Sequence, residues 1–182
     1  MFLGEREIGF DAAQIGFPSI GGCRAIVLVT GGGLFGFHLS GTLTQVKRDA
    51  FAHFIQAHAN GDPKRNLYIA SRVGGNAQHT NPGEVHAEIK EIAQALGFNG
   101  SVYWADVSGV GGASAYVQFD SLQNNTCIVT ARTWDDNVDR NPANMGPYAP
   151  ANRTMALGAP VAQVFTNVNP AGLKALYPTK VP

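Results

Sequence analysis

Two residues near the start of the chain have the types and the spacing of a catalytic thiol pair. Cys23 follows two glycines at the beginning of an apolar run, and His38 lies in the next apolar run. A cysteine attacks as the thiolate, so it needs a base or a cation nearby. The glycines, Gly22 above all, let a substrate amide approach the backbone and leave N–H groups free to hold an oxyanion. The pattern indicates nucleophilic chemistry, with Cys23 as the nucleophile and His38 as the base.

The two runs predict a β-hairpin, and its turn decides how close the pair lies. With a two-residue turn at Thr30-Gly31, Cys23 and His38 are direct cross-strand neighbours, with Cβ atoms about 4.5–5.5 Å apart. With a turn one residue later, His38 opposes Ala25, and Cys23 is its diagonal neighbour on the same face. A three-residue loop breaks this parity unless a bulge restores it. Two of the three turns therefore bring the thiol and the imidazole together.

A structural interpretation of the same residues stands beside the catalytic one. A cysteine in a strand is usually a small buried hydrophobe, and a histidine in an apolar run is usually part of the core. On residue type alone this is the more common case. The preceding glycines and the shared face make the catalytic interpretation comparable with it.

The elements that must position the pair predict an α+β fold. Apolar groups on both faces of the hairpin favour a central place in a covered sheet. Residues 42–61 form an expected helix with Val46, Ala50, Phe54 and Ala57 on its apolar face, and residues 81–97 form the second. Further expected strands are 66–73, 101–107, 114–120 and 126–134. The order is ββ-α-β-α-βββ, a layered sandwich of a mixed or antiparallel sheet with two helices.

The character of the sequence changes after Trp134. The stretch that follows is rich in Asn, Pro and Ala and has no sustained period. We expect one α+β domain over 1–134 and a loop-rich arm over 135–182 packed on it, with 161–168 as an edge strand or beside the sheet. The alternative is a disordered linker to a partner domain.

Several motifs resemble those of one enzyme superfamily. The run IGGCRAIVLVTGGGLFGFHLSG resembles the active-site hairpin of the cytotoxic necrotizing factor deamidases, and chemoreceptor glutamine deamidases have the same Cys–His layout. The stretches YIASRVGG, NPGEVHAEIKEIAQALGF and YWADVSGVGGASAYVQFD are similar to those proteins in type and order. The resemblance covers roughly residues 12–132.

The resemblance implies hydrolysis of a glutamine side chain to glutamate through a thioester. Cys23 would be the nucleophile, and His38 the base that later delivers a proton to ammonia. The substrate would be a protein presenting an exposed glutamine, such as a small GTPase or a receptor coiled coil, and a related transglutaminase reaction belongs to the same class. The arm after Trp134 favours a toxin or effector.

The third member of the site stays open. In the toxins a backbone carbonyl orients the histidine. Chemoreceptor deamidases have a threonine six residues before the cysteine, where this chain has Phe17. Ser19, Gln14 and Ser40 are the local polar candidates for an orienting group.

Composition excludes other classes of function. The 13 basic and 13 acidic residues cancel, which favours neither nucleic acid nor an anionic membrane as a partner. No apolar run suits a signal peptide or a bilayer span, so we expect a soluble protein that is cytoplasmic or is delivered into a target cell. Cys23 and Cys127 are expected to be free thiols. The histidines have no metal-like grouping, and we expect no metal and no cofactor.

The alternative function is a non-catalytic binding or inhibitor module on the same fold, in which Cys23 is a buried core residue. A catalytic thiol would alkylate fast and have a depressed pKa, whereas a core thiol would not.

Overall fold

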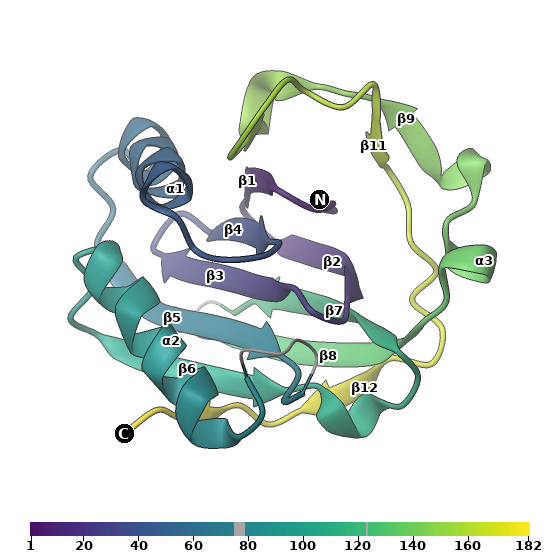
Figure 1. Ribbon diagram of the computed structural model, residues 1–182. Helices are drawn as coiled ribbons and strands as arrows, with labels where there is room; N and C mark the ends of the chain where they lie inside the picture. Colours follow the sequence, from purple (N-terminus) through teal and green to yellow (C-terminus); the bar gives the residue numbers. More distant parts are fainter. Residues whose placement is uncertain (75–78, 123) are drawn as a thin grey trace.

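The computed structural model describes residues 1–74, 79–122 and 124–182, and it confirms the α+β class (Figure 1). The strands of the first part are β1 (Glu7–Asp11), β2 (Gln14–Ile20), β3 (Arg24–Thr30), β4 (Leu34–Leu39), β5 (Lys64–Ser71), β6 (Ser101–Asp106), β7 (Ser114–Ser121) and β8 (Cys127–Trp134). Later strands are β9 (Met145–Pro147), β10 (Arg153–Met155), β11 (Gln163–Phe165), β12 (Lys174–Leu176) and β13 (Thr179–Lys180). The helices are α1 (Gln45–His58), α2 (Pro82–Ala95) and the short α3 (Asp136–Asp139), and single 3₁₀ turns lie at Ser108–Val110, Pro142–Asn144 and Pro150–Asn152.

Two sheets and a layer of helices make up the sandwich. The larger sheet has the order β10-β1-β4-β3-β5-β6-β13, and the smaller has the order β12-β8-β7-β2. All strand pairs are antiparallel except β5 and β6, which α2 connects as a parallel crossover, so the larger sheet is mixed. Figure 1 shows α1 and α2 on one side of the larger sheet and the smaller sheet on the other.

Two strands before the hairpin were not expected from the sequence. β1 and β2 are short and contain glycines, and β2 also contains Pro18, which cannot donate to a ladder. β2 lies at an edge of the smaller sheet, and its register shifts between Phe17 and Ile20. Strands tolerate proline at sheet edges and at bulges. Pro18, which made β2 hard to predict from the sequence, is therefore compatible with the place of β2 at the sheet edge.

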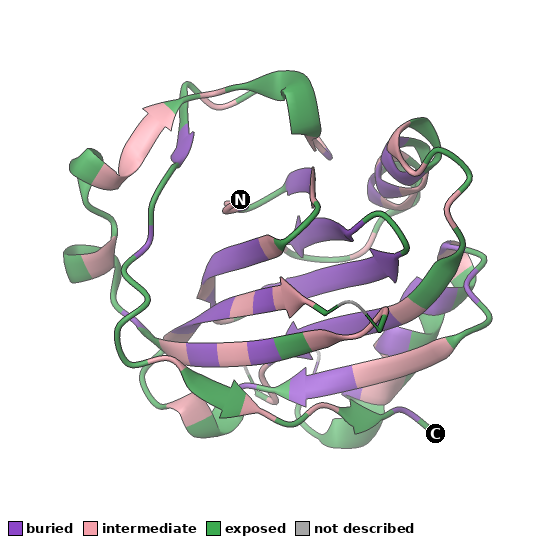
Figure 2. Ribbon diagram, turned by 180° about the vertical axis from the view of Figure 1, so that it is seen from behind, coloured by how far each residue is buried: buried purple, intermediate pink, exposed green. Residues whose placement is uncertain are grey.

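The predicted hairpin lies in the centre of the larger sheet. Every residue of β3 and β4 is buried, and Figure 2 shows the buried residues concentrated in the strands at the middle of the sandwich. On β3, Ile26 and Leu28 face the helices, while Ala25, Val27 and Val29 face the smaller sheet. Two apolar cores therefore share this strand.

The helices begin at side-chain caps. Thr44 accepts the N–H of Lys47 at the start of α1, and Asn81 forms a capping box with Glu84 at the start of α2. The expected face of α1 is partly wrong, because Val46 is 59% exposed and Lys47 lies inside at 7% exposure. The buried stripe of α1 is rotated by about one residue from the one that the apolar pattern indicated.

The arm, residues 135–182, returns to the domain at three strands. β10 pairs with β1, β13 pairs with β6, and β12 pairs with β8. Within 161–168 only β11 is a strand, and it pairs with β9 of the arm instead of with either sheet. Phe165 and Val168 are buried in a small cluster against Tyr116 and Trp134 of the smaller sheet.

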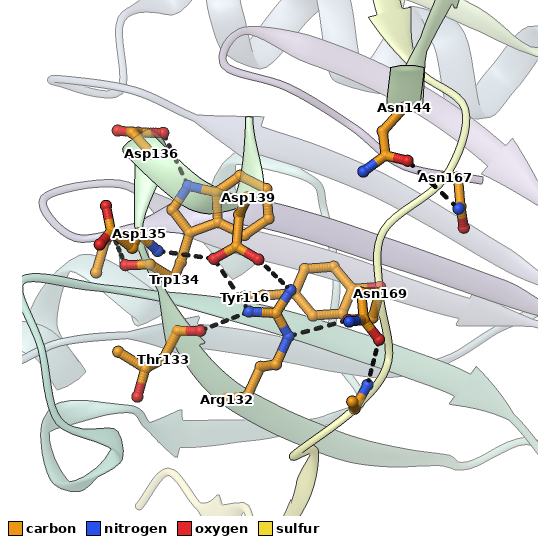
Figure 3. A network of polar contacts seen from close by, with 12 residues as sticks. Tyr116, Arg132, Thr133, Trp134, Asp135, Asp136, Asp139, Asn144, Asn167 and Asn169 are labelled. Atoms are coloured by element: carbon orange, nitrogen blue, oxygen red, sulfur yellow. Dashed lines mark hydrogen bonds and ion pairs between the residues drawn. The ribbon is translucent and has the colours of Figure 1, made fainter. Parts of the chain in front are cut away.

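One arginine network ties the start of the arm to the domain (Figure 3). Arg132 donates to both carboxylate oxygens of Asp139 at 2.7 and 3.2 Å, and to the carbonyl of Asn169 at 3.0 Å. Its guanidinium lies 5.5 Å from the ring centre of Tyr116 and 5.7 Å from that of Trp134. Arg132 stacks on aromatic rings and at the same time donates two hydrogen bonds to one carboxylate. Only the planar guanidinium of arginine can do both.

Replacing Arg132 by methionine is expected to release the arm. The change leaves the Asp139 carboxylate without its cation and the Asn169 carbonyl without its donor, and should lower the free energy of unfolding by about 1–3 kcal/mol. Limited proteolysis should then cleave between Asp139 and Asn169 much faster than in the parent chain. Arg140→Met removes an exposed charge from the same arm and is the control. Equal digestion of the two variants would contradict the anchoring role.

Candidate functional site

The register of the hairpin is the second of those expected. Arg24 pairs with Leu39 and Ala25 with His38, and the N–H of Thr30 donates to the carbonyl of Gly33 across the turn. The direct cross-strand pairing is therefore wrong, and Cys23 is the diagonal neighbour of His38. Both residues face the smaller sheet: Cys23 belongs to the core cluster between the sheets, and the His38 ring meets Phe17 edge-on with centroids 6.0 Å apart.

The His38 ring has a defined tautomer. Its Nδ1 lies 2.9 Å from the carbonyl oxygen of Leu3. A carbonyl only accepts, so Nδ1 carries the hydrogen and Nε2 has the free lone pair. Among the residues that the structure describes, Nε2 is buried and has no hydrogen-bond partner. A lone pair in this position is what a general base needs.

The Leu3 carbonyl is held in place by its own strand-like pairing. The N–H of Leu3 donates to the carbonyl of Gly16 at 2.8 Å, and the side chain of Leu3 is fully buried. The Leu3 carbonyl thus fixes the orientation of the His38 ring. Sequence could not indicate which carbonyl, because every residue carries one.

Burial favours the neutral form of both members of the pair. Full burial lowers the pKa of His38, against the opposing effects of the Leu3 carbonyl and the Glu5 carboxylate. Burial, followed by the charge of Glu5, raises the pKa of Cys23, against the hydrogen bond from Ser40 and the cations of Arg24 and Lys47. A raised thiol pKa is what the core interpretation of Cys23 predicts, and both members of the pair are neutral at rest.

The neutral state of His38 predicts a loss of stability in mild acid. In the unfolded chain its pKa is near the ordinary 6.5, and in the folded chain it is lower. The unfolded state therefore binds more protons, and stability that is present above pH 6.5 is lost as the pH falls, at a limiting slope of about 1.4 kcal/mol per pH unit.

Thermal unfolding of the parent chain and of His38→Gln, followed from about pH 7.5 to 5, isolates this contribution. The parent should lose stability more steeply than the variant. Burial raises the pKa of Glu7, which acts in the opposite direction and is common to both chains. His53→Gln, at an exposed position of α1, should keep the slope of the parent. A slope in His38→Gln as steep as in the parent would show that His38 is not held neutral.

Ser40 is the polar candidate that acts on the thiol. Its hydroxyl lowers the pKa of Cys23 and lies 3.2 Å from a carboxylate oxygen of Glu5. Continuing the β3–β4 register by one pair places Ser40 opposite Cys23. Ser40 is thus the side chain through which the surface carboxylate of Glu5 is connected to the thiol.

The other candidates have different contacts. Ser19 lies near the end of β2, where the register shifts, with φ at 63°, and its carbonyl accepts the N–H of Gly21 at 3.1 Å. Gln14 lies at the start of β2 and donates to Asp120 at 2.6 Å. Gly22 is exposed beside Cys23, and its carbonyl accepts from Arg24 at 3.3 Å.

Arg24 connects the chain segments on both sides of the thiol. It is 2% exposed, and its Nη1 donates to the carbonyls of Gly22 at 3.3 Å and Gly41 at 3.2 Å. Its Nε donates to one carboxylate oxygen of Glu88 on α2 at 2.7 Å, and Nη2 pairs with the other. His79 lies 3.3 Å from the same carboxylate. An arginine at the start of the long apolar run of β3 was the sequence signal for this anchoring of the two segments beside the thiol, and it was overlooked in the sequence.

Other chemistry is not assembled in the described part of the chain. Within it, no three His, Cys, Asp or Glu side chains come together as a metal site would require. Both cysteines are free, and burial raises the pKa of Cys127. None of the helices in that part is long and apolar enough to cross a membrane.

A cavity of about 330 Å³ has Glu5 in its wall. It is formed by the segment Gly4–Glu7 and by arm residues that include Arg140, Met145 and Val164. Glu5 belongs both to its wall and to the contact with Ser40. The arm therefore borders a cavity that shares Glu5 with the contact to Ser40.

No protein-family model matches the chain, and no curated protein is significantly similar to it in sequence.

Proposed function

We propose that the chain is a cysteine-dependent protein glutamine deamidase. The observation that carries the proposal is the state of His38: Nδ1 donates to the Leu3 carbonyl, and the unpartnered Nε2 belongs to a ring on the same sheet face as Cys23. A core histidine would be expected to satisfy both ring nitrogens, because an unpaired buried polar atom costs about 1–3 kcal/mol. A histidine that accepts a proton during the reaction needs one ring nitrogen without a hydrogen-bond donor bound to it.

The reaction follows from this arrangement. His38 Nε2 takes the thiol proton as Sγ of Cys23 attacks the side-chain amide carbon, and the carbonyl oxygen becomes an oxyanion. The C–N bond breaks as the imidazolium returns the proton to nitrogen, which leaves as ammonia. Water then attacks the thioester while His38 takes its proton. The C–S bond breaks, the proton returns to sulfur, and glutamate is released.

The exposure of the surrounding residues favours a side-chain amide over a peptide bond. Cys23 is 9% exposed, whereas its neighbours Gly22, Gly41 and Glu5 are exposed. The thiol thus lies below a rim of three loops. The primary amide of glutamine stands at the end of a flexible two-methylene stem and reaches such a group more easily than a backbone carbonyl does.

The rim and the arm favour a folded protein as the substrate. The cavity beside Glu5 is lined by residues of both charges, including Arg6, Glu7 and Arg140, and by apolar arm residues. Such a mixed surface suits a protein partner better than a nucleic acid. A toxin or effector acting on a host protein such as a small GTPase, soluble and delivered into the target cell, is the setting that we propose; a transglutaminase would use the same thioester with an amine in place of water.

The second candidate is a binding or inhibitor module in which the thiol is inert. It is favoured by the 9% exposure of Cys23 and by the burial that raises its pKa. Alkylation separates the two functions, because a thiol that substrate can reach reacts with a small electrophile under native conditions.

The deciding experiment is intact-mass analysis of candidate substrate proteins incubated with the chain. Each deamidated glutamine should add about 1 Da and release one ammonia, and tandem mass spectrometry should place the change on glutamine side chains. A panel of small GTPases and receptor coiled coils that shows no change, together with a Cys23 that resists alkylation in the folded protein, would favour the inert module.

A further inference from the structure

A buried ammonium lies beside the candidate thiol. Lys47 on α1 is 7% exposed, and its Nζ donates to the carbonyls of Ser40 at 2.6 Å and Thr42 at 2.7 Å. Among the described residues, no carboxylate lies within ion-pair distance of it. Burying a charged lysine without a carboxylate is costly, so its position calls for an explanation.

The contacts of Ser40 place this charge close to Cys23. The Ser40 carbonyl accepts from Lys47, and the β3–β4 register continued by one pair places Ser40 opposite Cys23, where its hydroxyl lowers the pKa of the thiol. Lys47 thus binds the residue that lies across from Cys23 on the neighbouring strand. Each charge favours the other, since Lys47 lowers the pKa of Cys23 and a Cys23 thiolate raises the pKa of Lys47, although burial dominates both values.

Neighbouring charges do not replace that of Lys47. Arg24 also favours the thiolate, but its guanidinium is neutralised by Glu88. Glu5 opposes the thiolate, and Arg24, followed by Arg6, opposes the ammonium of Lys47. His38 is neutral at rest because burial lowers its pKa. Of the cations that favour the Cys23 thiolate, Arg24 is paired with a carboxylate, whereas Lys47 is not paired with one among the described residues.

We propose that Lys47 is a positioning residue that supplies the positive charge for the Cys23 thiolate and fixes the Ser40–Thr42 turn against it. A buried imidazolium is a poor partner for a thiolate, because burial disfavours its charge. Lys47 compensates during the interval in which His38 holds the proton. Its two carbonyl bonds use two of the three ammonium hydrogens. The catalytic consequence rests on the proposed deamidase function, whereas the effect on the thiol does not.

The test measures the pH dependence of Cys23 alkylation by iodoacetamide in a Cys127→Ser background. Lys47→Gln retains an N–H donor for the carbonyls but removes the charge, and should raise the midpoint by about one pH unit, so that the rate near neutral pH falls about tenfold. Lys47→Arg should restore most of the rate. Lys90→Gln, at an exposed position of α2, is the matched control and should leave the profile unchanged.

Thermal unfolding of each variant separates charge from folding. A Lys47→Gln profile that coincides with that of Lys90→Gln would overturn the inference, as would an equal shift in Lys47→Arg and Lys47→Gln. If Lys47→Gln does not fold, the Lys47→Arg variant alone tests the inference. A folded Lys47→Arg variant whose alkylation midpoint is shifted by about one pH unit would overturn the inference. A shifted profile without deamidation of any substrate supports the inference while the proposed function fails; deamidation with an unshifted profile refutes only the inference.

Discussion

Cys23→Ser is expected to abolish deamidation, with turnover falling at least about 1,000-fold. Serine retains the shape of the residue, but its hydroxyl is far less acidic than a thiol, and a neutral buried imidazole with a lowered pKa is a weak base for it. The fold should survive, because Ser40 offers the new hydroxyl a hydrogen-bond partner. We expect a change in the free energy of unfolding of less than about 1 kcal/mol.

The matched control is Cys127→Ser, which alters the other free thiol. It should leave turnover intact, because Cys127 lies at the start of β8, paired with Ser121. The measurements are ammonia release on a modified substrate and urea unfolding of both variants. Full activity in Cys23→Ser, or several kcal/mol of lost stability with no functional change, would assign Cys23 to the core.

Arg24→Met is expected to cause the largest loss of stability, about 3–5 kcal/mol. The substitution leaves the Glu88 carboxylate, which is 14% exposed, with His79 as its remaining ion-pair partner among the described residues, and removes the donor that the carbonyls of Gly22 and Gly41 share. Alkylation of Cys23 should change as well, because the two segments beside the thiol lose their common anchor.

A double-mutant cycle with Glu88→Met checks the cause. If the ion pair is responsible, the double variant should be far less destabilised than the sum of the single variants, because no charge is left unpaired. Urea unfolding at neutral pH gives the four free energies. Additive losses would show that Arg24 and Glu88 stabilise the protein through separate contacts.

The hairpin could be predicted because two short apolar runs indicate strands and the glycines between them indicate a turn. Apolar groups on both faces of 23–30 indicated a central strand, and the glycines narrowed the turn to a few registers. The choice among them depended on which glycine takes which conformation, and Gly33 has φ at 146°. In this way the shared face of Cys23 and His38 was accessible from sequence, but their diagonal offset was not.

Electrostatics and helix phase were harder to predict. The apolar pattern of α1 placed Val46 inside, whereas Lys47 is inside because two carbonyls of the preceding turn bind its ammonium. The thiol pKa could not be predicted from the sequence because it depends on burial, which a local pattern does not contain. The role of Leu3 was inaccessible for a related reason: it acts through a backbone group that all residues share.

The pairing of the arm has a consequence for solubility. Its strands β10 and β13 form both outer edges of the larger sheet, and β12 covers one edge of the smaller. A chain ending at Trp134 would expose rows of unpaired N–H and C=O groups along β1, β6 and β8, which are templates for pairing with other chains. Such a truncated protein should aggregate instead of folding as a smaller monomer. By pairing with these edge strands, the arm protects the protein against self-association.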